Sequence, residues 1–139
     1  MYYDEMKVGD SASFAKTITD TDIYNFAGVT GDFNPAHVNQ VYAAATPFGG
    51  RIAHGMLCGS LFSTVFGTQM PGLGSIYVAQ SLSFRAPVKP GDTITATVTV
   101  KELAEKGRVI FDTTATNQDG TVVITGEATL LPPRRPKAE

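Results

Sequence analysis

The second half of the chain is patterned with a period of two, and this pattern restricts the fold more than any other feature. Ile94, Ala96, Val98 and Val100 alternate strictly with the four threonines of residues 93–99. Such alternation is typical of an antiparallel strand with one face in the core and the other in water. We therefore expect a sheet with one buried face, which another element must cover.

Further strands are expected on either side of this one. They are predicted at residues 11–18, 76–85, 109–117 and 121–131. The last two are joined by Gln118-Asp119-Gly120, which is a strong hairpin signal. Pro90-Gly91-Asp92 predicts a turn immediately before the threonine-rich strand.

The first half of the chain carries helix signals instead. Thr19 and the acidic residues after it form an N-terminal cap, and apolar residues follow at helical spacing. Asn39 predicts the start of a short helix over residues 41–45. Residues 55–66 are apolar nearly all round, which predicts a buried helix and not a surface helix. The fold class is therefore α+β, with an antiparallel sheet wrapped around a central helix.

Length and composition describe one ordinary globular domain. The chain has 139 residues, of which 42% are hydrophobic and 17% charged. We place the domain at residues 1–131 and a flexible tail at residues 132–139. The formal charge is −2 and the basic residues are scattered, so we expect no nucleic-acid partner.

The chain has features of a cytoplasmic protein. Its acidic start lacks the apolar segment of a signal peptide, and the apolar region 56–66 is too short to span a membrane. The single cysteine, Cys58, lies in an apolar run, and we expect it to be a small buried hydrophobe in a reducing compartment. The edges of the sheet favour pairing across a twofold axis, so we expect a homodimer.

The segment Gly31-Asp32-Phe33-Asn34-Pro35-Ala36-His37 has the residues for acid–base chemistry. It sets a carboxylate, Asp32, five residues before one of only two histidines, His37, and Asn34 and Pro35 stiffen the loop between them. A carboxylate and an imidazole held together can hold a water, remove one proton from it and deliver another. The alternatives are a loop carboxylate that accepts backbone N–H groups and an ordinary surface histidine.

A second set of candidate residues starts the predicted helix 55–66. Gly55 has no side chain, so a ligand carbonyl could approach the unpaired N–H groups of the helix start, as in an oxyanion site. The alternative for Gly55 is tight backbone packing. For His54 we weigh a second acid or base against packing and capping at the helix start. Ser63 is positioned either to bind a ligand or to bond the preceding helical carbonyl.

A metal site is not expected. The two histidines are seventeen residues apart, and with one embedded cysteine they fit no usual zinc spacing.

These segments together resemble the MaoC-like (R)-specific enoyl-CoA hydratases. The resemblance rests on residues 31–37, 54–57, 74–77 and 82–88, and it extends from about residue 8 to residue 131 in the same order. The Asp-x-Asn-Pro-x-His element is its specific part, whereas the glycine–helix element is shared more widely among hot-dog domains. Ala36 departs from the pattern, because relatives often have leucine there.

The resemblance implies a hot-dog fold and a homodimer with active sites at the subunit interface. It also implies syn addition of water to a trans-2-enoyl thioester, which gives the (R)-3-hydroxyacyl product. Asp32 and His37 match the catalytic pair, Gly55 matches the residue whose N–H holds the thioester carbonyl, and Ser63 matches a serine that lines the site. We expect Asp32 to be the base and His37 the source of the proton for Cα, although the two roles are exchangeable in a coupled pair.

Substrate contacts follow from the same resemblance. We assign Asn34, Ser63 and Arg85 to substrate binding and expect no cofactor, because coenzyme A is part of the substrate. The candidates for lining the acyl tail are Phe26, Phe33, Phe62 and Tyr77, and core packing is the alternative for each. The candidates for the CoA diphosphate are Arg51, Arg85 and Lys89, and the alternative is that they are solvated surface charges. Three other functions stay open: a hot-dog acyl-CoA thioesterase, a 3-hydroxyacyl-[acyl carrier protein] dehydratase, and a non-catalytic acyl-CoA binding subunit.

Overall fold

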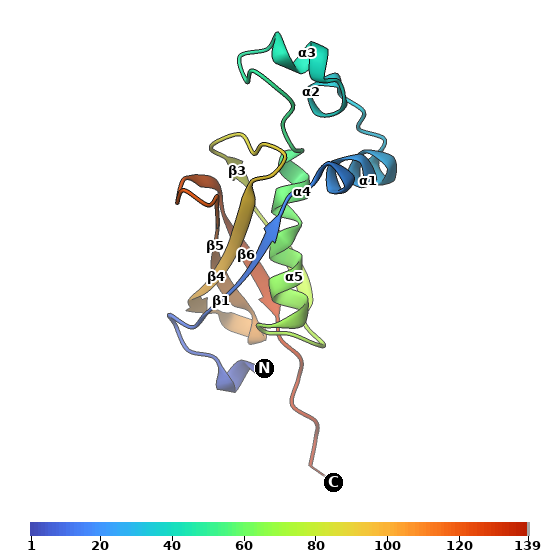
Figure 1. The fold of residues 1–139 in the computed structure, drawn as a ribbon. Helices are drawn as coiled ribbons and strands as arrows, with labels where there is room; N and C mark the ends of the chain where they lie inside the picture. The colour runs from blue at the N-terminus through green and yellow to red at the C-terminus, as the bar shows by residue number, and fades with distance from the viewer. Residues whose placement is uncertain (139) are drawn as a thin grey trace.

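One antiparallel sheet curves around a central helix (Figure 1), as the sequence predicts. The computed structural model describes residues 1–138. The strands are β1 (Ser11–Thr17), β2 (Ile76–Gln80), β3 (Ser83–Phe84), β4 (Thr93–Leu103), β5 (Val109–Thr116) and β6 (Val122–Leu131). Their order in the sheet is β1-β4-β5-β6-β2, and the short β3 pairs with β6. This arrangement is the hot-dog fold that the resemblance implies.

The inward face of the sheet forms the core together with the central helix. The alternation predicted for β4 is confirmed, because Ile94, Ala96 and Val98 have no exposed surface. They belong to one hydrophobic cluster with Phe62 and Phe66 of the central helix. Burying one such side chain contributes roughly 1.5–3 kcal/mol, so these contacts fix the helix against the sheet.

The central helix has two parts, α4 (Gly55–Gly59) and α5 (Leu61–Thr68), which follow each other without a break in Figure 1. Ser60 between them keeps right-handed helical backbone angles, so the two parts form one rod. The predicted buried helix is therefore confirmed, although one side of it is open to solvent. Met56 is 58% exposed and Ser63 is exposed as well, because the sheet covers one side of the rod only.

The period-two run over residues 76–85 is divided into β2 and β3. The backbone of Ser81 crosses closely over Gly126 in β6, where no larger residue fits, and the Ser81 N–H donates to the Glu127 carbonyl at 2.9 Å. This crossing bends the chain, so the run does not continue as one straight strand.

Three short helices precede the central helix and lie around and beyond its start (Figure 1). They are α1 (Asp20–Thr30), α2 (Pro35–Val38) and α3 (Gln40–Ala44). The predicted cap at Thr19 is confirmed: its hydroxyl accepts the Asp22 N–H at 3.1 Å, and the Asp22 carboxylate accepts the Thr19 N–H at 2.9 Å. That backbone hydrogen bond holds the pKa of Asp22 below its ordinary value. Asn39 caps α3 through the Tyr42 N–H at 3.0 Å, also as predicted.

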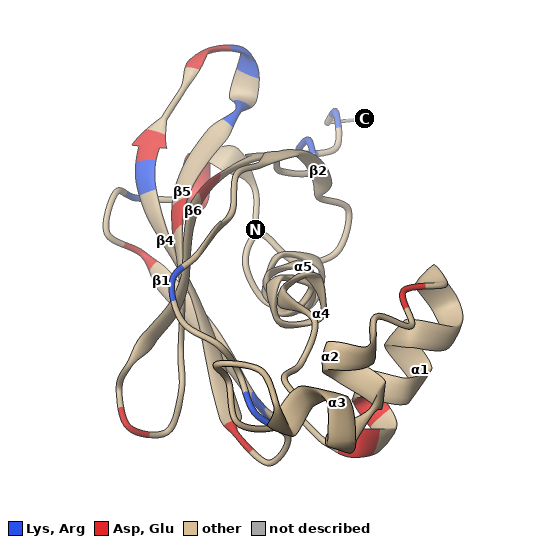
Figure 2. Cartoon of the chain, turned by 90° about the horizontal axis from the view of Figure 1, so that it is seen from above, with Lys and Arg blue, Asp and Glu red and all other residues tan. Residues whose placement is uncertain are grey.

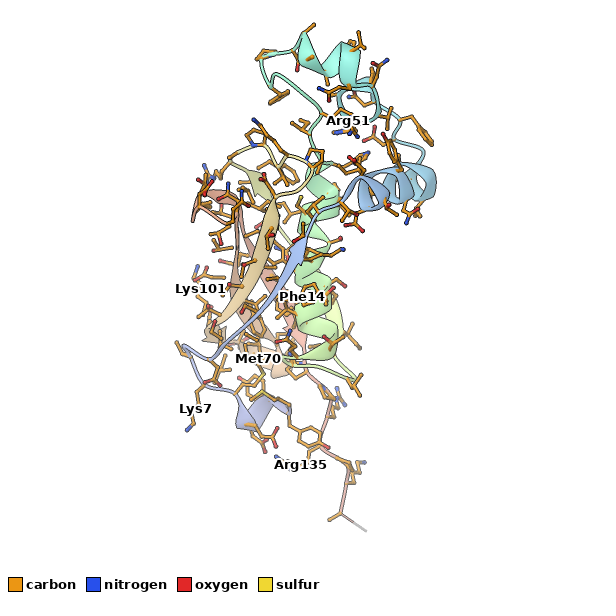
Figure 3. All side chains as sticks on the ribbon, viewed as in Figure 1. Lys7, Phe14, Arg51, Met70, Lys101 and Arg135 are labelled. Carbon is orange, nitrogen blue, oxygen red and sulfur yellow. The ribbon has the colours of Figure 1, made fainter. Side chains whose placement is uncertain are left out.

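Arg51 ties this helical segment together (Figure 3). Its guanidinium pairs with Asp20 at 2.9 Å and donates to the Tyr24 hydroxyl at 3.2 Å.

Both termini lie at the opposite end of the molecule from these three helices. There Arg135, in the non-regular segment after β6, pairs with Asp4 at 2.7 Å. None of the helices in the described residues has the length and apolar character needed to cross a membrane.

Candidate active site

The loop after α1 positions Asp32 and then turns the chain toward His37. Gly31 ends α1 with a left-handed φ of 80°, a conformation that glycine adopts without strain. The Asp32 carboxylate accepts the Asn34 N–H at 3.1 Å, and the Asn34 side chain in turn accepts the Ala36 N–H at 3.0 Å. These two hydrogen bonds start α2 immediately after the loop. Local geometry therefore brings Asp32 and His37 close together.

The His37 ring is held in one orientation by a single strong hydrogen bond. Its Nδ1 lies 2.7 Å from the Ile52 carbonyl oxygen. Since a carbonyl only accepts, Nδ1 carries the proton of the neutral ring and Nε2 carries the lone pair. One carboxylate oxygen of Asp32 and one ring nitrogen of His37 lie within 4.8 Å of each other. A water that makes hydrogen bonds of about 2.8 Å to each can bridge such a gap.

His54 completes a cluster with this pair. It is 2% exposed, and its Nε2 lies 3.0 Å from the main-chain oxygen of Asp32. Its ring stacks on the His37 ring with centroids 3.9 Å apart and packs against Phe26 at 4.8 Å. The expectation that it packs at the helix start is confirmed. The expectation that the His54 side chain caps the helix is wrong, because this side chain makes no capping hydrogen bond and bonds to the Asp32 loop instead.

This cluster has metal-ligating residue types, but its geometry does not suit a metal ion. The two imidazole planes are inclined by only 28° and are stacked, so their in-plane lone pairs do not converge on one point. His37 Nδ1 and His54 Nε2 are also taken by carbonyl oxygens. The arrangement suits proton transfer at His37 Nε2 better than metal binding.

The start of α4 presents backbone N–H groups beside the pair. Within residues 1–138 the Gly55 N–H has no hydrogen-bond acceptor, as expected for the first residue of a helix. A methyl group on Gly55 would lie 2.7 Å from two ring carbons of Phe84. Any side chain at this position would have to displace that ring, whereas glycine lines the cavity without doing so.

Asp32, His37 and Gly55 all line one cavity of about 700 Å³. Its walls are mainly apolar and include Phe26, Phe48 and Phe84, and Arg85 supplies a positive charge. The volume lies within the range of small-molecule sites. An apolar chamber with an acid–base pair and a free N–H group has the components for chemistry on a carbonyl compound.

Ser63 lies in a second cavity of about 490 Å³, next to the first. Phe26 and Met56 line both cavities, so they form the wall between them. Tyr77 also lines the second cavity, and burial raises its pKa to about 12. The Tyr77 hydroxyl therefore stays protonated and donates to the Gln80 side chain.

Four other residues that the sequence suggested as substrate contacts are engaged elsewhere or lie outside both cavities. Asn34 is engaged in capping α2, and Arg51 is already paired with Asp20. Phe62 lies in the core, and Phe33 lines neither cavity.

Phe48 and Phe84 were missed as lining residues. Phe84 belongs to the alternating run over residues 76–85, but its contact with Gly55 has no counterpart in local spacing.

The fold and this site together define a class: a hot-dog domain with an aspartate–histidine pair beside the start of its central helix. The chain belongs to the MaoC like domain family, whose sequence model matches residues 5–122. A relative named (R)-specific enoyl-CoA hydratase from Rhodospirillum rubrum is 58% identical over 135 residues, which cover 96% of this chain and 93% of that protein.

Two solved structures are similar throughout. The unliganded R-hydratase PhaJ1 of Pseudomonas aeruginosa superposes with a TM-score of 0.92 and 42% identity, covering 99% of this chain and 92% of that one. The (R)-hydratase of Aeromonas caviae, described as involved in PHA biosynthesis, has a TM-score of 0.89 and 43% identity, covering 92% and 98%.

Proposed function

We propose that this chain is an (R)-specific enoyl-CoA hydratase, which adds water reversibly and with syn geometry to trans-2-enoyl-CoA to give (R)-3-hydroxyacyl-CoA. The observation that carries the proposal is the Asp32–His37 pair, close enough to share one water and lining the same cavity as Gly55. The 58% identity to a protein of that name supports it over nearly the whole chain.

The electrophile is activated at Gly55. When water attacks Cβ, the thioester carbonyl draws the electrons of the double bond and its oxygen gains negative charge. The free Gly55 N–H at the start of α4 donates to that oxygen. One well-placed donor of this kind is worth about 3–4 kcal/mol of transition-state stabilisation.

The proton passes through the Asp32–His37 pair. With Asp32 ionised and His37 neutral, both groups accept hydrogen bonds from the water, His37 through Nε2. As the water oxygen bonds to Cβ, the pair takes one proton, and it then returns that proton to Cα on the same face. His37 can donate a proton to Cα only after its Nε2 has taken one. The sequence predicts Asp32 as the base and His37 as the acid, and the structure adds that His37 must first be protonated at Nε2.

The remaining substrate contacts are assigned by position. Arg85 lines the main cavity and is the candidate for the CoA phosphates. Ser63, in the second cavity, is a candidate for the acyl side of the substrate, and Asn34 acts by shaping the Asp32 loop. No cofactor takes part in this scheme, because every step uses side chains, backbone and water.

Hydration of crotonyl-CoA tests the proposal directly. The purified enzyme is expected to remove the enoyl-thioester absorbance without releasing a free thiol, and chiral analysis is expected to give the (R) product. Asp32→Asn and His37→Ala are each expected to abolish most of this activity while circular dichroism shows a folded protein. A nearly normal rate in either variant, or an (S) product, would contradict the assignment.

The alternative functions are separated by the same assay. Release of free CoA, detected with a thiol reagent, identifies a thioesterase. Faster hydration of enoyl groups on acyl carrier protein than on CoA identifies the carrier-protein dehydratase. Tight enoyl-CoA binding by calorimetry without turnover identifies a binding subunit.

We also propose that the chain forms a homodimer. Edge strand β2 leaves Ile76 and Val78 exposed, and an apolar strand edge of this kind favours pairing with a second copy. Light scattering after size exclusion is expected to give the mass of two chains. Val78→Lys is expected to produce monomers, whereas Val8→Lys, a matched change at an exposed valine outside the sheet, leaves the dimer intact. A monomeric native protein would contradict this proposal.

The proposed location is the cytoplasm. The single cysteine, which has no partner in the chain, supports a reducing compartment. Basic and acidic residues are interspersed over the described part of the chain (Figure 2), which does not favour a nucleic-acid partner.

A further inference from the structure

The buried imidazole of His54 has one hydrogen bond, and that bond ends on the Asp32 main chain. Nε2 faces the Asp32 carbonyl oxygen at 3.0 Å. Since the carbonyl only accepts, Nε2 must carry the proton of the neutral ring. Within residues 1–138 the other nitrogen, Nδ1, is buried and has no hydrogen-bond partner.

Packing alone does not account for a histidine at this position. A buried nitrogen without a partner is destabilising, and a phenylalanine or leucine of similar size would fill the space without that penalty. The Nε2–H donor is the property that an apolar residue lacks. Its function must therefore be sought at its acceptor, the Asp32 carbonyl.

The Asp32 loop has few ties to the rest of the protein. Its other side-chain and N–H hydrogen bonds are local, from the Asp32 N–H to the Thr30 hydroxyl and from the Asn34 N–H to the Asp32 carboxylate. The His54 bond spans 22 residues and fixes the loop to the start of α4. Without the His54 hydrogen bond, the Asp32 carboxylate would be carried by an exposed loop that only local hydrogen bonds hold in place.

Both members of the pair are in fact held by one short segment. The Ile52 carbonyl fixes His37 Nδ1, and two residues later His54 Nε2 fixes Asp32. The segment is itself anchored, since the Ala53 N–H donates to the Val88 carbonyl at 2.7 Å. Residues 52–55 thus set the spacing between the pair and the Gly55 N–H within four consecutive residues. Figure 1 shows the start of α4 beside α1, the helix that leads into the Asp32 loop.

We propose that His54 is a positioning residue for hydration: it donates from Nε2 to the Asp32 main chain and, through its stack on His37, keeps the two catalytic side chains around one water. The proposal rests on the proposed hydratase function. His54 does not touch the reacting atoms. Its removal therefore acts on the alignment of the water and not on the binding of CoA.

Two variants separate the hydrogen bond from the stack. His54→Phe keeps an aromatic ring against His37 but loses the donor. His54→Gln keeps an N–H donor at similar reach but loses the ring. We expect His54→Phe to lower kcat for crotonyl-CoA hydration about 10- to 100-fold with little change in KM, as for a misplacement on the 1 Å scale. We expect His54→Gln to recover most of that loss.

Three results would overturn the proposal: a kcat for His54→Phe within about twofold of the native value, a higher KM at unchanged kcat, or an equal loss in both variants. Circular dichroism and thermal unfolding establish that each variant is folded. His54→Leu is a second donor-free variant if phenylalanine does not fit the site.

A measurement on the native protein needs no substitution and no turnover. The chain has only two histidines, so a long-range 15N–1H spectrum with both imidazoles uncharged contains two ring patterns. We expect one ring protonated at Nε2, His54, and the other at Nδ1, His37. Nδ1 protonation of His54 would refute the contact even in a fully active enzyme. An inactive native enzyme with the expected tautomers would refute the proposed function and leave the contact supported.

Discussion

Replacing Gly55 by alanine tests whether the close packing at the start of α4 serves catalysis. The added methyl group would lie 2.7 Å from Cδ1 and Cε1 of Phe84, whereas ordinary van der Waals contact begins at 3.4 Å. The Gly55 backbone is not left-handed, so alanine itself is not strained there. The whole penalty falls on the Phe84 ring, which is 53% exposed and can swing aside.

The size of the effect differs between folding and catalysis. Overpacking in a closed core costs about 1–3 kcal/mol, and a ring that can move into solvent keeps the loss of unfolding free energy near the low end, about 1 kcal/mol. Alanine keeps its backbone N–H, so the effect on catalysis is steric: the methyl group takes the space through which the thioester carbonyl approaches that donor. An oxyanion that cannot reach its donor is expected to lower kcat by about 10²- to 10³-fold. We therefore expect Gly55→Ala to fold with a modestly lower melting temperature and to lose at least about 100-fold in kcat.

Initial rates of crotonyl-CoA hydration and thermal unfolding measure the two effects on the same samples. Gly67→Ala is the matched control, because a methyl group there meets nothing within 4 Å. The double variant Gly55→Ala with Phe84→Ala removes the clash, so it is expected to regain stability. Gly55→Ala with nearly native kcat would refute the close approach of the thioester carbonyl to the Gly55 N–H.

Four further predictions concern stability and substrate contacts. Thr19→Ala is expected to lower the free energy of unfolding by about 1 kcal/mol through loss of the α1 cap, measured by urea denaturation. Because the folded pKa of Asp22 lies below its ordinary 3.8, its stabilisation is present above that pH and is lost as the pH falls through the folded pKa; Asp22→Asn should remove this acid-side dependence, and an unchanged acid limb would contradict it. Phe62→Ala, at a fully buried core position, is expected to cost about 3–5 kcal/mol. Arg85→Met is expected to raise KM for CoA substrates, whereas Arg51→Met lowers the melting temperature slightly at unchanged KM, since its guanidinium is occupied; equal KM values in both would refute the assignment of Arg85.

Patterns that depend on near neighbours predicted this protein well. The β4 strand is recognisable because every second residue must enter the core, whatever lies opposite. The Asp32–His37 pair is recognisable for a similar reason, since Asn34 caps the next helix and turns the chain within a few residues. In both cases the governing contacts are local, so sequence spacing carries the information.

Contacts between distant segments were not predictable in this way. The bend that divides β2 from β3 depends on Gly126, in a strand far along the chain from Ser81. The bond from His54 to Asp32 joins a helix start to a loop 22 residues earlier. The composition of residues 55–66 correctly indicated burial, but composition does not tell which side of a helix the sheet leaves open.

The buried cysteine has a practical consequence. Cys58 is 1% exposed, and burial, with a smaller contribution from Asp92, raises its thiol pKa to about 12. Its reactive thiolate form is therefore scarce at neutral pH. We therefore expect the Cys58 thiol of the folded protein to react little when free CoA is titrated with a disulfide reagent, so that thioester hydrolysis can be measured at high enzyme concentration. The same thiol becomes reactive when the protein unfolds, so the rate at which Cys58 is labelled reports the rate of unfolding.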